Sequence, residues 1–322
     1  LGMMLLKNID LNKFKKALHN IIRILILFVA INFLIKLYKL LILNEPLVSY
    51  PSGGIDVETF LFGYCLIMLG SRRVSKVERL LYFCIIIFFV TDPILSMSKS
   101  GLLVLLTVVS FYILKISNIK IRIISISFIG IILIYLNHLG INFAVFERFN
   151  SALTILADLQ NTDGAKDWST FARIVETRAA IAGLEASYFY PFSYLFGLGS
   201  GAVWFSSEFL GHGLAAENYR ASGGVHHIHI EIVSLLHRHG LIGLAMYILL
   251  LFQTFRMSLS SGRFFKQNDW EMYAVMVAIA LCCVSSATYM LTDTSIYGHF
   301  KIGLLAAVAR TFHKYARQKV VN

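Results

Sequence analysis

Histidine is the most concentrated chemically active residue type in this chain. Five histidines lie within fourteen residues, at His226, His227, His229, His237 and His239. An imidazole can exchange a proton near neutral pH, and its neutral form is also a common metal ligand. The histidines stand where a polar loop passes into an apolar stretch that ends near Phe252. Ionisable side chains are costly at the mouth of a membrane span, so this cluster indicates a functional site.

The composition of the whole chain indicates an integral membrane protein. Of its 322 residues, 57% are hydrophobic and 15% are charged, and the mean hydropathy is +0.70. A soluble domain would carry about 25% charged residues. The apolar residues also occur in long runs rather than in alternation. We therefore predict an all-α, polytopic membrane protein with about eight transmembrane helices and one large extracytoplasmic loop.

The predicted spans are separated by short polar segments, except for one long one. They cover residues 21–43, 59–70, 80–95, 101–114, 123–136, the apolar end of 223–252, 270–291 and 299–309. Several are shorter than the roughly 20 residues that a helix needs to cross a bilayer, so one short pair could be re-entrant. The organisation predicted is transmembrane helices 1–5 in residues 1–136, the large loop in 137–226, and helices 6–8 with a cytoplasmic tail in 227–322.

The distribution of charge predicts the orientation. The formal net charge is +11, but residues 137–225 hold five basic and eight acidic residues, a net of −3, which leaves +14 for the rest. Most of that positive charge flanks the spans, as the positive-inside rule describes, so the 137–226 loop is predicted outside the cell. Membrane lipids are expected partners, and no nucleic-acid partner is predicted because no recognition module accompanies the charge.

The cysteines and histidines give no clear metal signature. All four cysteines lie within apolar spans and have no disulfide or CxxC spacing. A histidine metal site stays an alternative, because His237 and His239 follow His229 by eight and ten residues. Glu231 is the only nearby carboxylate, so no metal and no cofactor is predicted.

The large loop contains a predicted helix and a glycine-rich stretch. Ser169 is a candidate cap for a helix through FARIVETRAAIAGLEASYF, which Pro191 would stop. The sequence YLFGLGSGAVW that follows has glycine at every second residue, at 197, 199 and 201. It lacks the lysine and Ser/Thr of a nucleotide-binding loop. Flexible backbone over a substrate groove and a plain glycine turn both fit this pattern.

The histidine-rich segment, residues 223–252, resembles the signature of the bacterial O-antigen ligase and polymerase superfamily, whose members are integral membrane glycan transferases. That family has a histidine, a glycine eleven residues later, a GxxG and then an apolar span. Here His229 is followed by Gly240 and Gly243, and His227 completes the HxH doublet often seen there. Ile230 departs from the pattern, because the family usually has Asn or Ser at that position.

Weaker matches lie upstream in the expected order. LSMSKSGLL is similar to the family's Ser-Arg-Gly helix entrance, with Lys99 in place of the arginine, and Arg238 stands where an acidic residue is often found. The FARIVETRAAIAG stretch and the glycine-rich stretch resemble the family's outer-loop helix, with Arg173 as its arginine. ERF would supply a further loop arginine, Arg148. The resemblance covers roughly residues 80–310, and since members often have more spans, it predicts amino-terminal helices before Leu1.

The resemblance implies a transferase of the bacterial inner membrane, with the large loop on the outer face. Its donor would be a glycan on undecaprenyl diphosphate and its acceptor a hydroxyl of a glycan or lipid-linked sugar. His229 would be the general base, and attack on the anomeric carbon would invert its configuration. Arg173 would assist catalysis by pairing with the diphosphate, as Arg148 and Lys99 would, in place of a metal. Supporting positions would be His227, Gly240 and Gly243.

Several alternatives stay open. A polymerase of O-antigen, capsule or exopolysaccharide is slightly favoured over a ligase that transfers the glycan to lipid A core or to protein. A transporter of lipid-linked glycans would place its charges mid-span, often in inverted repeats, and a scaffold would need no chemistry.

Individual residues also have purely structural interpretations. Arg173 could pair with Glu176 along its helix, and Lys99 could be a snorkelling charge. Arg178 is expected on the solvated surface, together with Arg220. The remaining histidines are expected to be interface or packing residues: His226, His237 and His239.

Overall fold

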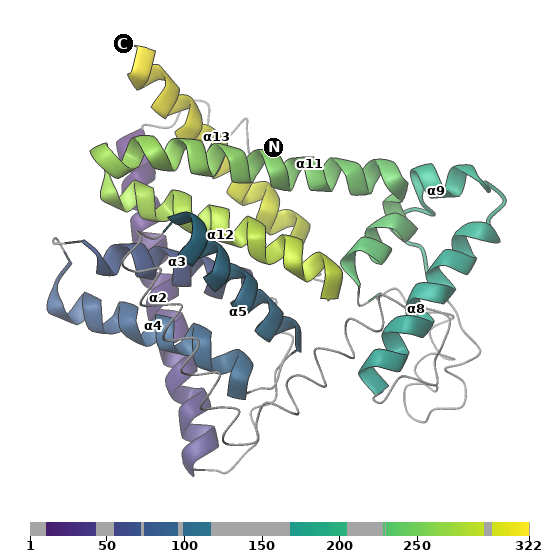
Figure 1. Cartoon of the computed structure of the whole chain (residues 1–322), viewed down its shortest axis with the longest axis horizontal. Helices are drawn as coiled ribbons and strands as arrows, with labels where there is room; N and C mark the ends of the chain where they lie inside the picture. Colours follow the sequence, from purple (N-terminus) through teal and green to yellow (C-terminus); the bar gives the residue numbers. More distant parts are fainter. Residues whose placement is uncertain are drawn as a thin grey trace. The chain divides into compact units, whose positions relative to one another are not determined.

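A computed structural model describes residues 11–42, 55–71, 74–95, 99–116, 168–204, 228, 230–292 and 298–321 of the chain. The regular secondary structure of these residues is helical (Figure 1). This confirms the all-α prediction. The helices are α2 (Leu11–Ile42), α3 (Ile55–Leu69), α4 (Lys76–Leu95), α5 (Lys99–Phe111), the π-helical turn η1 (Tyr112–Ile116), α8 (Trp168–Glu185), α9 (Phe192–Phe196), α11 (Glu231–Asn268), α12 (Trp270–Thr292) and α13 (Gly298–Val321).

Three of these helices are long and apolar enough to cross a membrane: Asn12–Lys36, Glu231–Asn268 and Trp270–Leu291. Val57–Leu69 and Leu103–Ile116 are apolar but shorter. The predicted span 123–136 lies outside the described residues, and of the predicted loop 137–226 the structure describes 168–204. A membrane protein is therefore supported, whereas the count of eight spans and the outer position of the loop stay predictions.

The chain divides into two compact units. Unit 1 contains Leu1–Asn118, Leu250–Thr288 and Ile296–Asn322, and unit 2 contains Ile119–Leu249 and Tyr289–Ser295. Helices α2 to α5 and α13 therefore belong to unit 1, and α8 and α9 belong to unit 2. Helix α11 contributes its first part to unit 2 and its second part to unit 1.

The core of unit 1 is built around α12, whose residues 274–282 are each at most 3% exposed. Small residues let α3 approach it closely. A Cβ atom on Gly63 of α3 would lie 2.8 Å from Cδ1 of Leu281 and 3.0 Å from Cα of Ala278. Such close packing of small residues is a main source of helix association within membranes. The indole of Trp270 also donates a hydrogen bond to the carbonyl of Ile67, over 3.1 Å.

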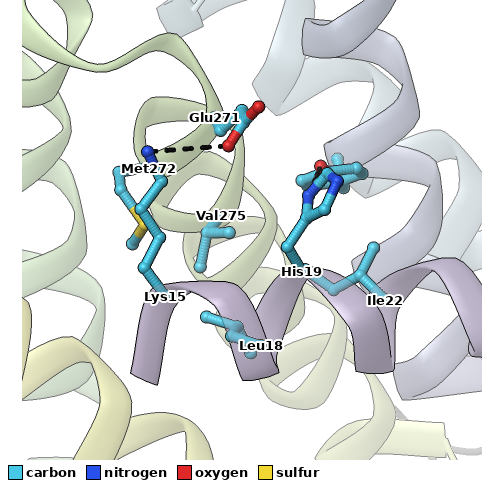
Figure 2. Close-up of a pocket in the computed structure, with 8 residues that line it drawn as sticks. Lys15, Leu18, His19, Ile22, Glu271, Met272 and Val275 are labelled. Atoms are coloured by element: carbon cyan, nitrogen blue, oxygen red, sulfur yellow. Dashed lines mark hydrogen bonds and ion pairs between the residues drawn. The ribbon is translucent and has the colours of Figure 1, made fainter. Parts of the chain in front are cut away.

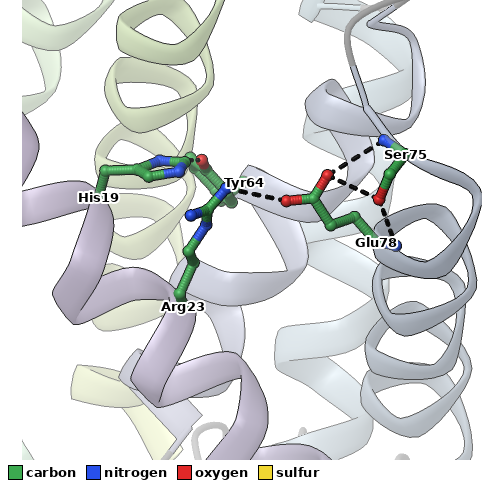
Figure 3. A network of polar contacts seen from close by, with 5 residues as sticks. All are labelled: His19, Arg23, Tyr64, Ser75 and Glu78. Carbon is green, nitrogen blue, oxygen red and sulfur yellow. Dashed lines mark hydrogen bonds and ion pairs between the residues drawn. The ribbon is translucent and has the colours of Figure 1, made fainter.

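Helix α4 begins with a capping box (Figure 3). The Ser75 hydroxyl accepts a hydrogen bond from the Glu78 N–H, and the Glu78 carboxylate accepts one from the Ser75 N–H, over 3.2 and 3.1 Å. This reciprocal pairing satisfies N–H groups that have no partner within the helix. Arg23 of α2 lies 3.0 Å from the same carboxylate, and His19 contacts the Tyr64 hydroxyl nearby. These contacts tie the starts of α2 and α4 to the end of α3.

At the other end of α2, Lys36 is paired within the protein. Its Nζ lies 2.6 Å from Oδ1 of Asp92 on α4 and 5.1 Å from the ring centre of Phe88. An ion pair lowers the cost of holding a charge close to an apolar span. This pairing explains how a lysine is accommodated there.

A small pocket of unit 1 lies where the first turns of α2 and α12 meet α3 (Figure 2). Lys15 lies beside it, with Nζ 2.6 Å from Oδ2 of Asp269 and 3.6 Å from Oε2 of Glu271. The pocket has room for about one water molecule. The pocket lies beside polar side chains at the ends of helices, and it is too small for a glycan. Its lining consists of Lys15, Leu18, His19, Ile22, Tyr64, Glu271, Met272 and Val275.

The basic residues Arg256, Arg263 and Lys266 were expected in a loop between the predicted spans that end near Phe252 and begin at Trp270, but this segment is helical. The basic tail after Ala309 is helical too. Helix α11 continues to Asn268, and α13 continues to Val321. The second part of α11 has one buried face, with a spacing of three or four residues, made by Leu251, Thr254, Ser258, Ser261 and Phe265. Two of its hydroxyl groups, those of Thr254 and Ser258, each donate a hydrogen bond to a carbonyl one turn earlier, over 2.7 and 2.8 Å.

Candidate functional site

Helix α8, which carries Arg173, packs against the start of α11 within unit 2. A small buried core joins Val175 and Ala180 of α8 to Trp204 and Ile228. Ala179 of α8 and Val233 of α11 pack against this core. Ile228 is the residue just before His229, so the predicted base lies one residue from side chains that contact the arginine-bearing helix.

Helix α11 is bent at Gly240. The glycine has φ 66° and ψ −171°, which are not helical angles. Figure 1 shows the segments before and after this residue meeting at an angle. The glycine-rich stretch bonds to the turn before the bend. The N–H of Leu198 donates to the carbonyl of His237 over 2.8 Å, and the N–H of Gly199 donates to the carbonyl of Arg238 over 3.0 Å. The bend therefore serves to join two segments that are about forty residues apart in the sequence.

Two glycines make this junction possible. A Cβ atom on Gly240 would collide with the backbone of Leu195, and one on Gly197 would collide with the backbone of Arg238. Both residues also have a positive φ, which is 74° at Gly197. Side-chain-bearing residues rarely adopt such angles. Gly243, one turn after the bend, leaves room for the Cβ of His239.

The glycine-rich stretch contains a turn, since the N–H of Ala202 donates to the carbonyl of Gly199 over 3.0 Å. It also crosses α11 at the bend, through Gly197 and Leu198, and Gly199 has φ 93°. A Cβ atom on Gly201 would meet nothing within 4 Å, and Gly201 has no unusual φ. Neither alternative considered from the sequence included the backbone hydrogen bonds to α11.

Arg173 has a buried side-chain nitrogen. Its Nε has no hydrogen-bond partner within the described part of the chain. Burying a donor without a partner costs about 1–3 kcal/mol, and an anionic ligand would remove that cost.

His237 is the most buried histidine of the described residues and lies against α8. It is 1% exposed, and a Cβ atom on Gly183 would lie 3.4 Å from its Nε2. Neither ring nitrogen has a hydrogen-bond partner among the described residues. His237 was expected to be an interface or packing residue, and its burial agrees with packing, although buried polar atoms normally have hydrogen-bond partners.

Sequence reasoning missed several polar groups of unit 2. Glu176 and Glu231 are only 4% and 6% exposed. The sequence interpretation had considered Glu176 only as a partner of Arg173 and Glu231 only as the carboxylate near a possible metal site. Arg178 is half-buried, whereas the sequence suggested a solvated surface position. The sequence did hold a signal for the two carboxylates, which is their closeness to predicted site residues. Glu231 follows His229 by two residues, and Glu176 follows Arg173 by three.

The predicted site residues are described to different extents. Arg173, Gly240 and Gly243 belong to unit 2, and the segments that carry them pack together. Lys99 is the first residue of α5 in unit 1, and its side chain lies outside the described part. Outside it too are three further predicted site residues, His227, His229 and Arg148. Among the described residues, no group of three His, Cys, Asp or Glu side chains could hold a metal ion.

No protein-family model matches the sequence. No curated protein matches it at a significant level. The function must therefore be inferred from the residues of the chain itself.

Proposed function

We propose that this chain is a membrane glycosyltransferase that moves a glycan from undecaprenyl diphosphate to a sugar hydroxyl during surface-polysaccharide assembly. One observation carries the proposal. Three segments that the family resemblance singles out, around Arg173, Gly197 and Gly240, are joined in unit 2 by a buried core and by backbone hydrogen bonds. Nothing in their spacing along the chain requires them to meet, so their meeting supports a shared site.

The proposed reaction needs a base and a cationic partner for the leaving group. The base removes the proton of the acceptor hydroxyl while that oxygen forms a bond to the anomeric carbon. The bond from this carbon to the diphosphate oxygen breaks, and the diphosphate leaves with the electron pair. Attack from the opposite face inverts the anomeric configuration. His229 takes the proton in this scheme, because imidazole exchanges protons near neutral pH.

Arg173 is the proposed partner of the diphosphate. A guanidinium group donates several hydrogen bonds in one plane and can pair with two phosphate oxygens at once. The buried, unpaired Nε of Arg173 supports this role, because an anion would complete its hydrogen bonding. Arg148 and Lys99 are proposed as further cationic contacts.

The residue that precedes His229 in the sequence packs against the helix that carries Arg173. Ile228 is 1% exposed and belongs to the core that includes Val175, two residues after Arg173. This packing supports the proposal of a shared site, because reacting groups must be held at a defined separation.

A reconstituted transfer assay tests the proposal. Purified full-length protein in detergent is incubated with a glycan on undecaprenyl diphosphate and with a second glycan as acceptor, and released undecaprenyl diphosphate is measured. We expect release by the wild type and a loss of about 10²–10⁴-fold for His229→Ala, the range typical of a removed general base. Arg173→Ala should lose most activity, and Arg173→Lys should regain only part of it, because lysine keeps the charge without the planar fork.

Arg220→Ala is the matched control, since Arg220 belongs to the same predicted loop and is expected at its solvated surface. It should retain wild-type activity. Product length identifies the form of the enzyme, because a ladder of products indicates a polymerase and a single transfer indicates a ligase. If folded wild-type protein releases no undecaprenyl diphosphate with any acceptor, or if His229→Ala retains full activity, the proposal is wrong.

A further inference from the structure

Unit 2 exposes an aromatic segment that begins after α8 and includes α9. We call residues 188–196 the aromatic segment. Its exposed rings belong to Tyr188, Phe189, Tyr190, Phe192 and Phe196, and the first two are 105% and 74% exposed. Single exposed apolar residues are ordinary on a protein surface, but a contiguous group of large ones marks a site of interaction.

The aromatic segment itself contains no charged residue, and Glu185, just before it, is bonded to the Tyr194 hydroxyl. The sequence holds no Asp, Glu, Lys or Arg between Glu185 and Glu208. A segment that faced water, or an ordinary protein partner, would normally mix apolar rings with charges at its rim. Tyrosine and phenylalanine without charge are typical of the boundary between lipid and water, where each ring is apolar and each hydroxyl can reach the headgroups.

The aromatic segment has a defined conformation. The Ser193 hydroxyl donates to the carbonyl of Leu184 over 2.6 Å, and the Tyr194 hydroxyl donates to Glu185 over 3.1 Å. Backbone hydrogen bonds also join Ser193 to Phe189 over 3.0 Å. The rings are thus displayed outward from a folded turn, so their exposure is built into the fold.

The attachment of the segment to α11 places it at a particular level along that helix. Directly after the aromatic segment, Leu198 and Gly199 bond to the carbonyls of His237 and Arg238. The run of polar and basic side chains in α11 ends there, and the next charged residue after Arg238 is Arg256. This change from charged to apolar sequence is where a membrane helix enters the bilayer. Because the aromatic segment is bonded to α11 at this point, we place its rings at the same depth as the change from charged to apolar sequence.

Exposed apolar side chains continue from this boundary along α11. Leu241, Ile242, Met246, Ile248 and Leu249 are all exposed and all belong to unit 2. They provide the outward apolar face of a helix that is long and apolar enough to span a membrane. The same unit thus presents an aromatic group at the boundary and an aliphatic face beyond it, in the order in which a bilayer changes from headgroup to acyl chain.

We propose that the aromatic segment lies in the lipid–water interface of the leaflet where α11 enters the membrane, with its rings at the level of the phospholipid headgroups. The partner is the phospholipid bilayer itself. This role is independent of the transfer reaction, because it follows from exposure, lack of charge and attachment to α11. It makes the segment an anchor that fixes the depth of α8, α9 and the bend of α11 together.

Tryptophan fluorescence quenching tests the proposal. Full-length Phe189→Trp and Phe192→Trp proteins are reconstituted into vesicles of phosphatidylethanolamine and phosphatidylglycerol that contain lipids with a quencher either near the headgroup or deep in the acyl chain. The signal of the wild type, which has three tryptophans, is subtracted. We expect clear quenching of each added tryptophan, and stronger quenching by the shallow label than by the deep one.

Gln318→Trp is the control, since Gln318 is an exposed residue in the basic last turns of α13. Its tryptophan should be quenched weakly by both labels. If the tryptophans of the aromatic segment are quenched no more than this control, the segment does not contact lipid and the proposal is wrong. Stronger quenching by the deep label would also overturn it, because the rings would then lie in the hydrocarbon core.

Discussion

Two nitrogen-bearing side chains of unit 2, Arg173 and His237, are buried with atoms that lack partners among the described residues. The family resemblance implied a phosphate-binding role for Arg173. It could not predict that Nε would be buried, because burial depends on how α8 packs against residues at 204 and 228. The unpaired state of His237 was equally hidden, since its ring is enclosed against Gly183 of a different helix.

His237 gives a stability prediction. We expect His237→Met to raise the free energy of unfolding by about 1 kcal/mol, because a buried ring with two unpaired nitrogens is replaced by an apolar side chain of similar size. Thermal unfolding in detergent measures the change. A clear loss of stability would show that the imidazole has a partner in the membrane-embedded protein.

Glu78 gives a pH dependence. The Ser75 N–H, the Ser75 hydroxyl and the guanidinium of Arg23 lower the pKa of Glu78, and partial burial opposes them. Because the pKa is lower in the folded protein, this carboxylate stabilises the fold above the pKa of an unfolded glutamate, about 4.3. That contribution is lost as the pH falls through the lowered folded value.

The difference between wild type and Glu78→Gln reveals this contribution. Wild type should unfold at a higher temperature than Glu78→Gln at pH 7, and the gap should narrow as the pH is lowered below about 4. Measuring both proteins in the same buffers removes the general effect of acid. A gap that is constant with pH would show that the ionised form of Glu78 does not stabilise α4.

At the scale of the elements, the bend of α11 determines what unit 2 can join. Gly197→Ala and Gly240→Ala should each lower the free energy of unfolding by at least about 1–3 kcal/mol, because both force a side chain into a glycine-only conformation and into the backbone of another segment. Thermal unfolding or limited proteolysis of the purified variants measures the loss.

Gly201→Ala is the control for these two variants, since Gly201 lies in the same stretch and its added methyl group would meet nothing within 4 Å. It should be close to wild type. Equal destabilisation by all three substitutions would mean that the stretch tolerates no side chain for some other reason, and the proposed junction at the bend would lose its support.

The helices themselves were largely predictable, and their connections were not. Long apolar runs predicted the positions of α2, α12 and the first apolar part of α11, because hydrophobicity is recorded directly in the residue types. The basic residues 256–266 were wrongly interpreted as a loop, since positive charge was used as a sign of topology and the buried face through Thr254 and Ser258 was overlooked. The hydrogen bonds from Leu198 to His237 and from Gly199 to Arg238 involve only backbone atoms, so no pattern of side chains in the sequence predicts them.

At the scale of the whole molecule, orientation in the membrane is the first prediction. A cysteine that replaces Asp163, in the predicted outer loop, should react with a membrane-impermeant maleimide in intact spheroplasts. A cysteine that replaces Gln318 should react only after permeabilisation. Of the native cysteines, Cys65, Cys282 and Cys283 are buried, and labelling of the wild type measures the background from the half-buried Cys84. The opposite labelling pattern would invert the assignment of inside and outside.

The burial of α12 bears on how the protein is made. Of the most apolar stretch of this helix, 78% is enclosed by other helices, so lipid contacts little of it once the protein is complete. We expect its hydrophobicity to act also at an earlier step, when the helix leaves the translocation machinery and enters the bilayer before its neighbours surround it. Polar substitutions in this stretch should then impair membrane insertion during synthesis, in addition to any effect on the packing of the finished protein.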